Sequence, residues 1–303
     1  MNWPGKTHQA QSSETEPCRS GRTVMDSRNY IVAFDLQSAA DCPRDFRLPH
    51  AAASFDAGIF LPRDDPDWFG RSAYPPRVLL LGASAFWAIA HPRANEIPRH
   101  CEIERISSVA SGHMLLKGWL DFRGAGFPST IPYNTRGLPA VLRFMRRFRS
   151  RWLGAAEQAD APQAALGDEL DTRFANALAD ELDPGESVAA RFFQRPRGFR
   201  RRWPLQGTRW TPGNLLVNTG SRLIWVTDRY RGSRLQYGRI ASYAPLRTVQ
   251  DLRVAPHENE WHVQVDVAGE VSWLIPVAGE RRREAEQFAM LVKVRSLRSI
   301  LRT

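Results

Sequence analysis

Short apolar runs that end at glycine, proline or asparagine recur along most of the chain. Runs at 78–81 and 85–89 flank Gly82-Ala83-Ser84, a pattern typical of a β-hairpin. Other strands are predicted at 58–61, 103–109, 114–122 and 130–133. This spacing indicates a mostly β unit between residues 46 and 153.

A helix is predicted at the end of this unit. After Asn134, which suits a helix cap, apolar residues recur at helical spacing and basic residues fall on the opposite side. The apolar positions are Val141, Met145, Phe148 and Trp152, and the basic ones are Arg143, Arg146, Arg147 and Arg151. One face of this helix is therefore expected to cover the sheet.

Residues 186–303 repeat this order of elements. The clearest hairpin joins 215–217 to 223–226 through Asn218-Thr219-Gly220-Ser221, and a second joins 263–267 to 271–275. A long helix follows from Glu280. We match 79–81 with 215–217, 106–109 with 240–243, and 131–133 with 275–277. Because the element order is kept while loop lengths differ, the pattern indicates a duplication.

The remaining segments separate and flank the two units. Residues 1–45 are polar and show little periodicity, so we expect a disordered arm, with Met1 and Met25 both open as the start. Residues 154–185 are predicted to form an acidic linker. It comprises a flexible stretch at 155–167 and a short amphipathic helix at 168–182. The final helix is longer than one unit needs, and its tail is a candidate surface for a homo-oligomer.

Composition narrows the class of protein. The 303 residues are 43% hydrophobic, which excludes a wholly disordered chain. No window holds 18 consecutive apolar residues, so no transmembrane segment is predicted, and no secretory signal is recognised at the N-terminus. The three cysteines form no C-x-x-C motif, which favours a reducing cytoplasm over a disulfide scaffold or a cysteine-built zinc site.

Charge is distributed in blocks. The net charge is +10, and the basic residues are nearly all arginine. Residues 154–190 nevertheless hold nine acidic side chains and one basic one. The excess of arginine fits recognition of phosphate or carboxylate, and it equally fits a GC-rich coding bias. The acidic block could neutralise basic neighbours in the same molecule.

The segment 191–203 has the most unusual composition, because arginines and aromatic rings alternate along it. The candidate anion-binding residues are Arg195, Arg197, Arg200, Arg201 and Arg202, and the candidate interaction surface is Phe199 and Trp203. Three interpretations stay open. The segment could bind anionic lipid or an acidic protein, follow nucleic-acid phosphates, or pair with the acidic block at 168–186.

No motif for chemistry is recognised. Gly82-Ala83-Ser84 lacks the second glycine of a nucleophile elbow, and His257 and His262 do not have zincin spacing. The glycines at 124 and 126 precede Phe127-Pro128, which does not suit a phosphate-binding helix start. We therefore expect no catalytic residue, no metal site and no cofactor.

In element order the two units resemble tandem bacterial pleckstrin-homology-like (PH/GRAM-type) domains. The residues that carry this resemblance are the hairpins at 215–226 and 263–275, the helix from Glu280 and their first-half counterparts, about 225 of the 303 residues. The tryptophan usual in the family's closing helix is not evident in the second unit, where Phe288 takes that place, and the first unit has Trp152 late in its helix.

The resemblance implies an α+β, mostly β chain of two small barrels or bent sheets, each closed by a C-terminal helix. It further implies a non-catalytic adaptor that binds a protein partner or anionic lipid headgroups. The expected location is the cytoplasm, with a peripheral position at the inner membrane as the alternative. A basic nucleic-acid-binding protein and an oligomerising structural protein remain alternatives, as does an enzyme of an unrecognised type.

Overall fold

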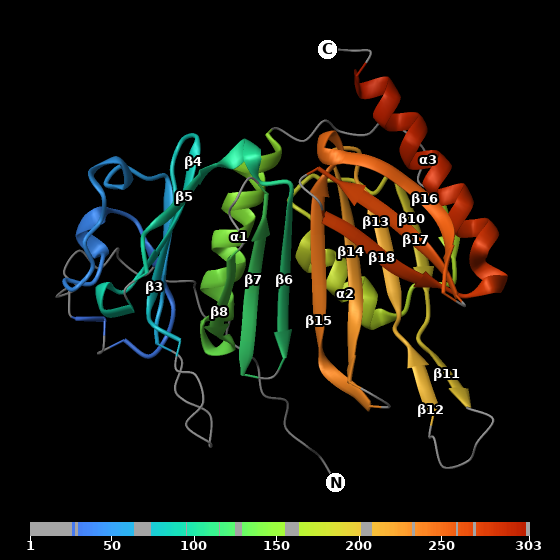
Figure 1. Cartoon of the computed structure of the whole chain (residues 1–303), viewed down its shortest axis with the longest axis horizontal. Helices are drawn as coiled ribbons and strands as arrows, with labels where there is room; N and C mark the ends of the chain where they lie inside the picture. Colours follow the sequence, from blue (N-terminus) through green and yellow to red (C-terminus); the bar gives the residue numbers. More distant parts are fainter. Residues whose placement is uncertain are drawn as a thin grey trace, which may run out of the picture.

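The structure is mostly β, as predicted (Figure 1). It is a computed structural model. The residues that it describes are 26–27, 30–63, 74–94, 96–114, 116–124, 129–154, 164–200, 208–231, 234–258, 260–268 and 271–300.

An antiparallel five-stranded sheet forms the N-terminal end of the molecule (Figure 1). Its strands, in spatial and chain order, are β1 (Phe34–Leu36), β2 (Ala57–Leu61), β3 (Arg77–Leu81), β4 (Ala85–Ala90) and β5 (Arg99–Glu102). The β3–β4 hairpin turns at Gly82-Ala83-Ser84, which confirms the prediction for this segment.

An eight-stranded sheet crosses the centre of the molecule and contains strands from both halves of the chain. Its spatial order is β8-β7-β6-β15-β14-β13-β10-β9. The first-half strands are β6 (Ser108–Met114), β7 (Lys117–Arg123) and β8 (Ser129–Asn134). The others are β9 (Ala164–Gly167), β10 (Ala190–Gln194), β13 (Asn214–Asn218), β14 (Arg222–Arg231) and β15 (Arg234–Pro245).

Two smaller sheets and three α-helices complete the described fold. The sheets are the pair β11 (Arg197–Arg200) with β12 (Thr208–Thr211), and the three strands β16 (Val249–His257), β17 (Glu260–Val267) and β18 (Val271–Val277). The helices are α1 (Leu138–Leu153), α2 (Thr172–Glu181) and α3 (Arg282–Ile300). Figure 1 shows α1 between the five-stranded sheet and β6–β8, and α3 along β16.

Local sequence explains where α1 begins and ends. The Asn134 side chain accepts a hydrogen bond from the Arg136 backbone (2.9 Å) and so caps the 3-10 turn Thr135–Gly137, which leads directly into α1, and Pro139 lies in the first turn of α1. The helix ends at Gly154, which has φ +75°. Its predicted apolar face is confirmed, because Val141, Met145, Phe148 and Trp152 are all buried, and the four predicted outer arginines are exposed.

The two halves repeat one order of elements. In the first, the strands β2–β5 are followed by the 3-10 turn η5 (Ile103–Arg105), then β6–β8 and α1. In the second, the strands β10, β13, β14 and β15 are followed by the 3-10 turn η8 (Leu246–Thr248), then β16–β18 and α3. By this order Ile106, directly after η5, corresponds to Val249, directly after η8. The match of 106–109 with 240–243 was therefore wrong, because 240–243 belong to the strand before the turn.

Several predicted boundaries need correction. The disordered arm does not extend to residue 45, since Phe34–Leu36 pair with β2 and Phe46 is buried; residues 1–25 lie outside the described part. The predicted flexible stretch 155–167 ends in β9, which pairs in parallel with β10. The linker helix is confirmed as α2, and it starts where Asp171 accepts a hydrogen bond from the Phe174 backbone (3.0 Å).

The expected closed barrels are not formed by the described strands. Instead of closing on its own unit, β6 pairs with β15 of the other, from Val109 opposite Tyr243 to His113 opposite Arg239. β15 is twelve residues long, whereas β5 has only four, so β15 offers β6 the longer edge. Bent sheets joined edge to edge replace two separate barrels.

One hydrophobic cluster extends across this junction. It contains Phe122, Phe148 and Trp152 of the first half together with Phe193 and Tyr243 of the second. A separate cluster lies between α3, β16–β18 and the inner residues of β10 and β13, with Phe288 of α3 fully buried. The buried Ala285, Ala289 and Val292 confirm the predicted inner face of α3.

Candidate functional site

The arginines predicted to bind anions are partly engaged within the chain. The Arg195 backbone donates to Asp168 (3.0 Å), and its guanidinium donates to the Glu169 carbonyl oxygen (3.4 Å). Arg197 forms an ion pair with Glu280, just before α3. Of the three interpretations of this segment, these contacts agree with the one in which its arginines pair with acidic residues of the same chain.

The rest of the predicted loop carries less structural information. Phe199 and Arg200 belong to β11, where their backbones pair with β12, but their side chains lie outside the described part. Arg201, Arg202 and Trp203 are outside the described residues altogether. The tail of α3 beyond Lys293, the predicted oligomer contact, is described only as helix backbone up to Ile300.

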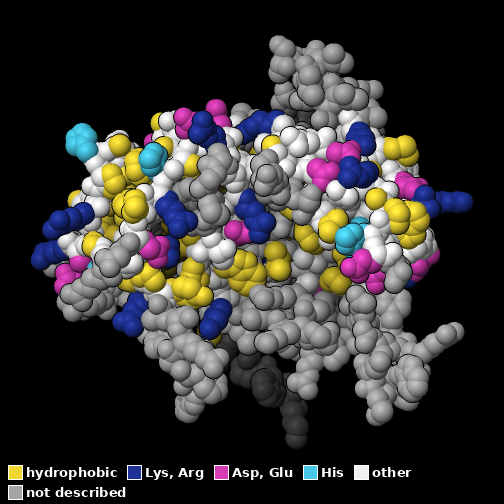
Figure 2. All heavy atoms as spheres, in the orientation of Figure 1, with side chains coloured by type: hydrophobic (Ala, Val, Ile, Leu, Met, Phe, Trp, Pro, Cys, Tyr) yellow, Lys and Arg dark blue, Asp and Glu magenta, His cyan; other side chains and the backbone are white. Residues whose placement is uncertain are grey.

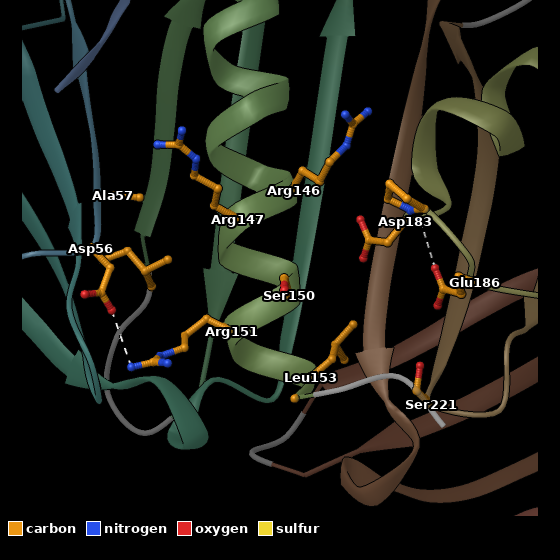
Figure 3. A pocket seen from close by; sticks show the side chains of 13 residues that line it. Asp56, Ala57, Arg146, Arg147, Ser150, Arg151, Leu153, Asp183, Glu186 and Ser221 are labelled. Atoms are coloured by element: carbon orange, nitrogen blue, oxygen red, sulfur yellow. Dashed lines mark hydrogen bonds and ion pairs between the residues drawn. The ribbon is translucent and has the colours of Figure 1, made fainter. Parts of the chain in front are cut away.

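A cleft runs along the exposed side of α1 and has a volume of about 610 Å³ (Figure 3). One wall is α1, which contributes Arg146, Arg147, Ser150, Arg151 and Leu153. The five-stranded sheet adds Asp56, Ala57 and Leu81, and the second half of the chain adds Asp183, Pro184, Glu186 and Ser221. The cleft therefore lies where the two halves meet.

Two arginines of this cleft have no partner in the part of the chain that the structure describes. Arg151 pairs with Asp56 (3.4 Å) and donates to the Ala83 carbonyl oxygen (2.9 Å). About two turns earlier in α1, Arg143 pairs with Asp35 (2.7 Å). Neither Arg146 nor Arg147 makes a side-chain hydrogen bond or ion pair with any residue that the structure describes. In Figure 3 the two side chains extend to opposite sides of α1, Arg147 toward the five-stranded sheet and Arg146 away from it without pointing at Asp183.

The carboxylates of the opposite wall are paired with arginines that lie deeper in the molecule. Asp183 accepts from Arg149 (3.5 Å) and lies 3.4 Å from Arg222, while Glu186 accepts from Arg222 Nε (3.0 Å) and from the Asp183 backbone (3.0 Å). Arg222 is fully buried. The carboxylates of this wall thus already have cationic partners, whereas Arg146 and Arg147 do not.

Behind the wall lies a buried polar network. Arg149 of α1 pairs with Glu181 of α2 (3.3 Å), and the same carboxylate accepts the hydroxyl hydrogen of Tyr243 in β15. Burial and the Glu181 charge both raise the pKa of Tyr243, which therefore stays neutral. Burial opposes the charge on Arg149, but the Glu181 and Asp183 carboxylates outweigh it and raise the Arg149 pKa.

The burial of Arg149 was missed by the sequence analysis, although the sequence carries a signal for it. Arg149 is four residues after Met145 and three before Trp152, which places it on the apolar side of α1. An arginine on a buried face needs carboxylate partners, and the acidic block at 168–186 supplies them.

The described residues show no arrangement for metal chemistry. No group of three or more His, Cys, Asp or Glu in this part of the chain could hold a metal ion. Burial raises the pKa of the Cys42 and Cys101 thiols to about 12, so both are protonated. Among the described helices, none has the length and apolar character needed to span a bilayer.

Comparison with known proteins adds no family. No protein-family model matches the chain, and no curated protein matches it.

Proposed function

We propose that this protein is a non-catalytic binding protein that recognises an acidic segment of a partner protein in the cleft beside α1. The observation that carries the proposal is the pair Arg146 and Arg147, two guanidinium groups without a partner among the described residues, in a cleft of about 610 Å³. Charge-assisted hydrogen bonds from arginine to carboxylate are stronger than neutral ones and fix orientation.

The mixed charge of the cleft favours a peptide over a polyphosphate. Asp56, Asp183 and Glu186 line the same cavity and already pair with arginines, so Arg146 and Arg147 are the unpaired cations that the described residues offer there. Two positive charges match the carboxylates of a short acidic segment better than a chain of phosphates. A peptide instead presents both carboxylates and backbone N–H groups, which suits a wall of arginines facing carboxylates. Leu81, Leu153 and Pro184 add apolar surface for its side chains.

The outer surface agrees with this choice. On the face shown in Figure 2, the described Lys and Arg side chains are spaced among acidic and hydrophobic ones and do not form one continuous basic patch. A flat anionic membrane is attracted most strongly by clustered basic residues. Dispersed charge with a localised cleft is more typical of selective protein recognition.

The repeated order of elements supports the pleckstrin-homology-like assignment as part of the proposal. Four antiparallel strands, three further strands and a closing helix occur in both halves, with the pair β11–β12 inserted between β10 and β13 of the second. The resemblance implies an adaptor, and the free buried thiols of Cys42 and Cys101 fit a reducing cytoplasm.

The test is binding of a fluorescein-labelled peptide of alternating glutamate and leucine residues, followed by anisotropy at physiological salt. We expect the Arg146→Ala/Arg147→Ala variant to bind at least about tenfold more weakly. The reason is that losing one hydrogen bond to a charged group costs about 1.5–3 kcal/mol, and about 1.4 kcal/mol is tenfold in affinity.

The matched control removes two arginines elsewhere. Arg105 and Arg283 are exposed and lie outside the cleft, so Arg105→Ala/Arg283→Ala lowers the net charge equally. Equal loss in both variants would mean that binding follows net charge alone. The wild type could instead bind anionic vesicles or single-stranded DNA more tightly than the peptide, and lose that binding in the Arg146→Ala/Arg147→Ala variant. That result would show that the partner is the membrane or the nucleic acid and not an acidic peptide.

A further inference from the structure

A second, larger cavity lies on the N-terminal part of the molecule, away from the α1 cleft. Its volume is about 1200 Å³. It is lined by residues from several separate segments. The basic and aromatic ones are Arg44, Arg47, Arg63, His91, Arg136 and Tyr30.

Four arginine side chains of this cavity lack partners among the described residues. Arg44, Arg47, Arg63 and Arg136 are all exposed, and none of their guanidinium groups forms a hydrogen bond or ion pair with another residue in the described ranges. They come from three places in the chain: the segment 44–47, the residues after β2 and the residues after β8. The fold therefore brings to one concavity four guanidinium groups that have no partner among the described residues.

The three carboxylates that line the same cavity, Asp26, Asp45 and Glu96, are already engaged. Asp45 accepts hydrogen bonds from the Ser27 backbone (2.8 Å) and hydroxyl (2.6 Å) and contacts His91 Nε2 (2.9 Å). Partial burial raises the pKa of Asp45, but these hydrogen bonds outweigh burial and hold the pKa below its ordinary value. Glu96 pairs with Arg77 (2.9 Å). An anion that enters the cavity therefore meets unpaired arginines, whereas the carboxylates already have partners.

These contacts also fix the cavity floor. Asp45 ties the segment at Ser27 to His91 at the end of β4, and the ring of Phe46 lies 5.6 Å from the His91 ring. Pro75, Pro76 and Pro92 form rigid parts of the wall. A floor held in this way keeps the arginine-bearing segments in place before any ligand arrives.

We infer that this cavity binds a small molecule that carries two or more phosphate groups. Guanidinium groups bind phosphate through paired N–H donors, and four of them exceed what a single phosphate can engage. The inference is independent of the peptide cleft, because the two cavities share no lining residue.

The experiment is calorimetric titration of the full chain with inorganic pyrophosphate, ATP and orthophosphate at physiological salt. Pyrophosphate and ATP are expected to bind at least about tenfold more tightly than orthophosphate, because they engage more of the arginines. Tighter binding of ATP than of pyrophosphate would identify a nucleotide, whereas equal binding would identify the phosphates alone as the recognised group.

Two paired variants locate the site. Arg44→Gln/Arg47→Gln and Arg63→Gln/Arg136→Gln are each expected to weaken pyrophosphate binding by about tenfold or more, since each removes two guanidinium partners. Arg105→Gln/Arg283→Gln and Arg146→Gln/Arg147→Gln should leave it within about twofold, because those arginines lie outside this cavity. Thermal unfolding confirms that each variant is folded.

Two results would overturn the inference. One is absence of pyrophosphate and ATP binding by the folded wild-type chain. The other is a loss of affinity that is the same in all four variants, which would show that phosphate responds only to net charge. Failure here leaves the peptide cleft untouched, because the Arg146 and Arg147 variant is measured separately against its own probe.

Discussion

Arg149 of α1 and Glu181 of α2 form an ion pair in which each side chain is only 3% exposed. The two residues belong to different parts of the chain, the first repeated unit and the acidic linker. Tyr243 of β15 donates its hydroxyl to the same carboxylate, so three elements meet at Glu181. The junction between the halves thus has a polar centre inside its hydrophobic cluster.

Removing the carboxylate from this centre is expected to destabilise the protein strongly. Glu181→Ala leaves Arg149 buried without its partner, and breaking a buried pair from one side costs about 3–5 kcal/mol. Asp180→Ala is the neighbouring control. Asp180 pairs with Arg239 at the surface with its side chain 56% exposed, and an exposed pair contributes about 0–1 kcal/mol. Urea unfolding of both variants decides the matter, and similar losses would show that Glu181 is not the centre of the junction.

Stability should also fall as the pH drops below neutral, through His113. This residue lies in β6 opposite Arg239 of β15, where burial and the Arg239 charge lower its pKa despite Glu181 and Asp180. In the unfolded chain the pKa is about 6.5, so the unfolded state binds the proton more readily between that value and the lowered one. The contribution of His113 to the free energy of unfolding is therefore fully present above pH about 6.5. It is lost as the pH falls from that value through the lowered pKa of the folded state.

The variant His113→Gln isolates this contribution. Unfolding free energies of wild type and variant are measured at neutral pH and at pH about 5. The difference between the two pH values should be smaller in the variant, because it lacks the titrating group. An unchanged pH dependence would assign the effect to other residues.

Two glycines of β6 and β7 are expected to tolerate no side chain. A Cβ at Gly118 would lie 2.2 Å from the Tyr133 ring, and one at Gly112 would lie 2.0 Å from the Trp119 ring. Each ring covers the glycine of the neighbouring strand, as the cross-strand pairs Gly118–Tyr133 and Gly112–Trp119 show. Gly118→Ala should cost about 1–3 kcal/mol, since Tyr133 is buried and has little room to move.

The control for this prediction is Gly279→Ala. A Cβ at Gly279 meets nothing within 4 Å, and the residue does not have a positive φ. Its thermal midpoint should stay close to that of wild type, while the Gly118→Ala midpoint falls. If both midpoints move alike, close packing against Tyr133 is not the cause.

Local patterns in the sequence were sufficient for elements whose partners lie nearby. The hairpin of β13 and β14 turns at Asn218, whose side chain accepts from the Gly220 backbone (2.8 Å), and both signals are adjacent in the sequence. β1 was missed because three residues carry too little periodicity. Its extended form comes from pairing with β2 more than twenty residues away.

The shared sheet and the cleft could not be predicted for the same reason. β6 and β15 join residues more than one hundred positions apart, and no periodicity specifies which of several edges pairs with which. Arg146 and Arg147 were placed on the outer face of their helix correctly. That face became a cleft only because residues 183–186 and 221 fold opposite it.

The remaining prediction concerns the edge of β16, which pairs only with β17 among the described strands. Its counterpart in the first half, β6, accepts a neighbour on that edge, namely β15. Counted from the 3-10 turns that begin at Ile103 and Leu246, Pro256 takes the place of His113. Proline has no N–H to donate, and the exposed Arg253 nearby adds charge, so the edge is protected against a further strand.

Removing that protection should promote self-association. The variant Arg253→Val/Pro256→Val gives the edge of β16 a backbone N–H at position 256 and removes the charge at position 253. The corresponding edge of β6 already pairs with β15. We expect its sedimentation coefficient to rise with protein concentration, while Arg253→Lys, which keeps the charge and the proline, stays like wild type. A double variant that sediments like wild type at every concentration would show that another part of the chain, and not Pro256, keeps this edge unpaired.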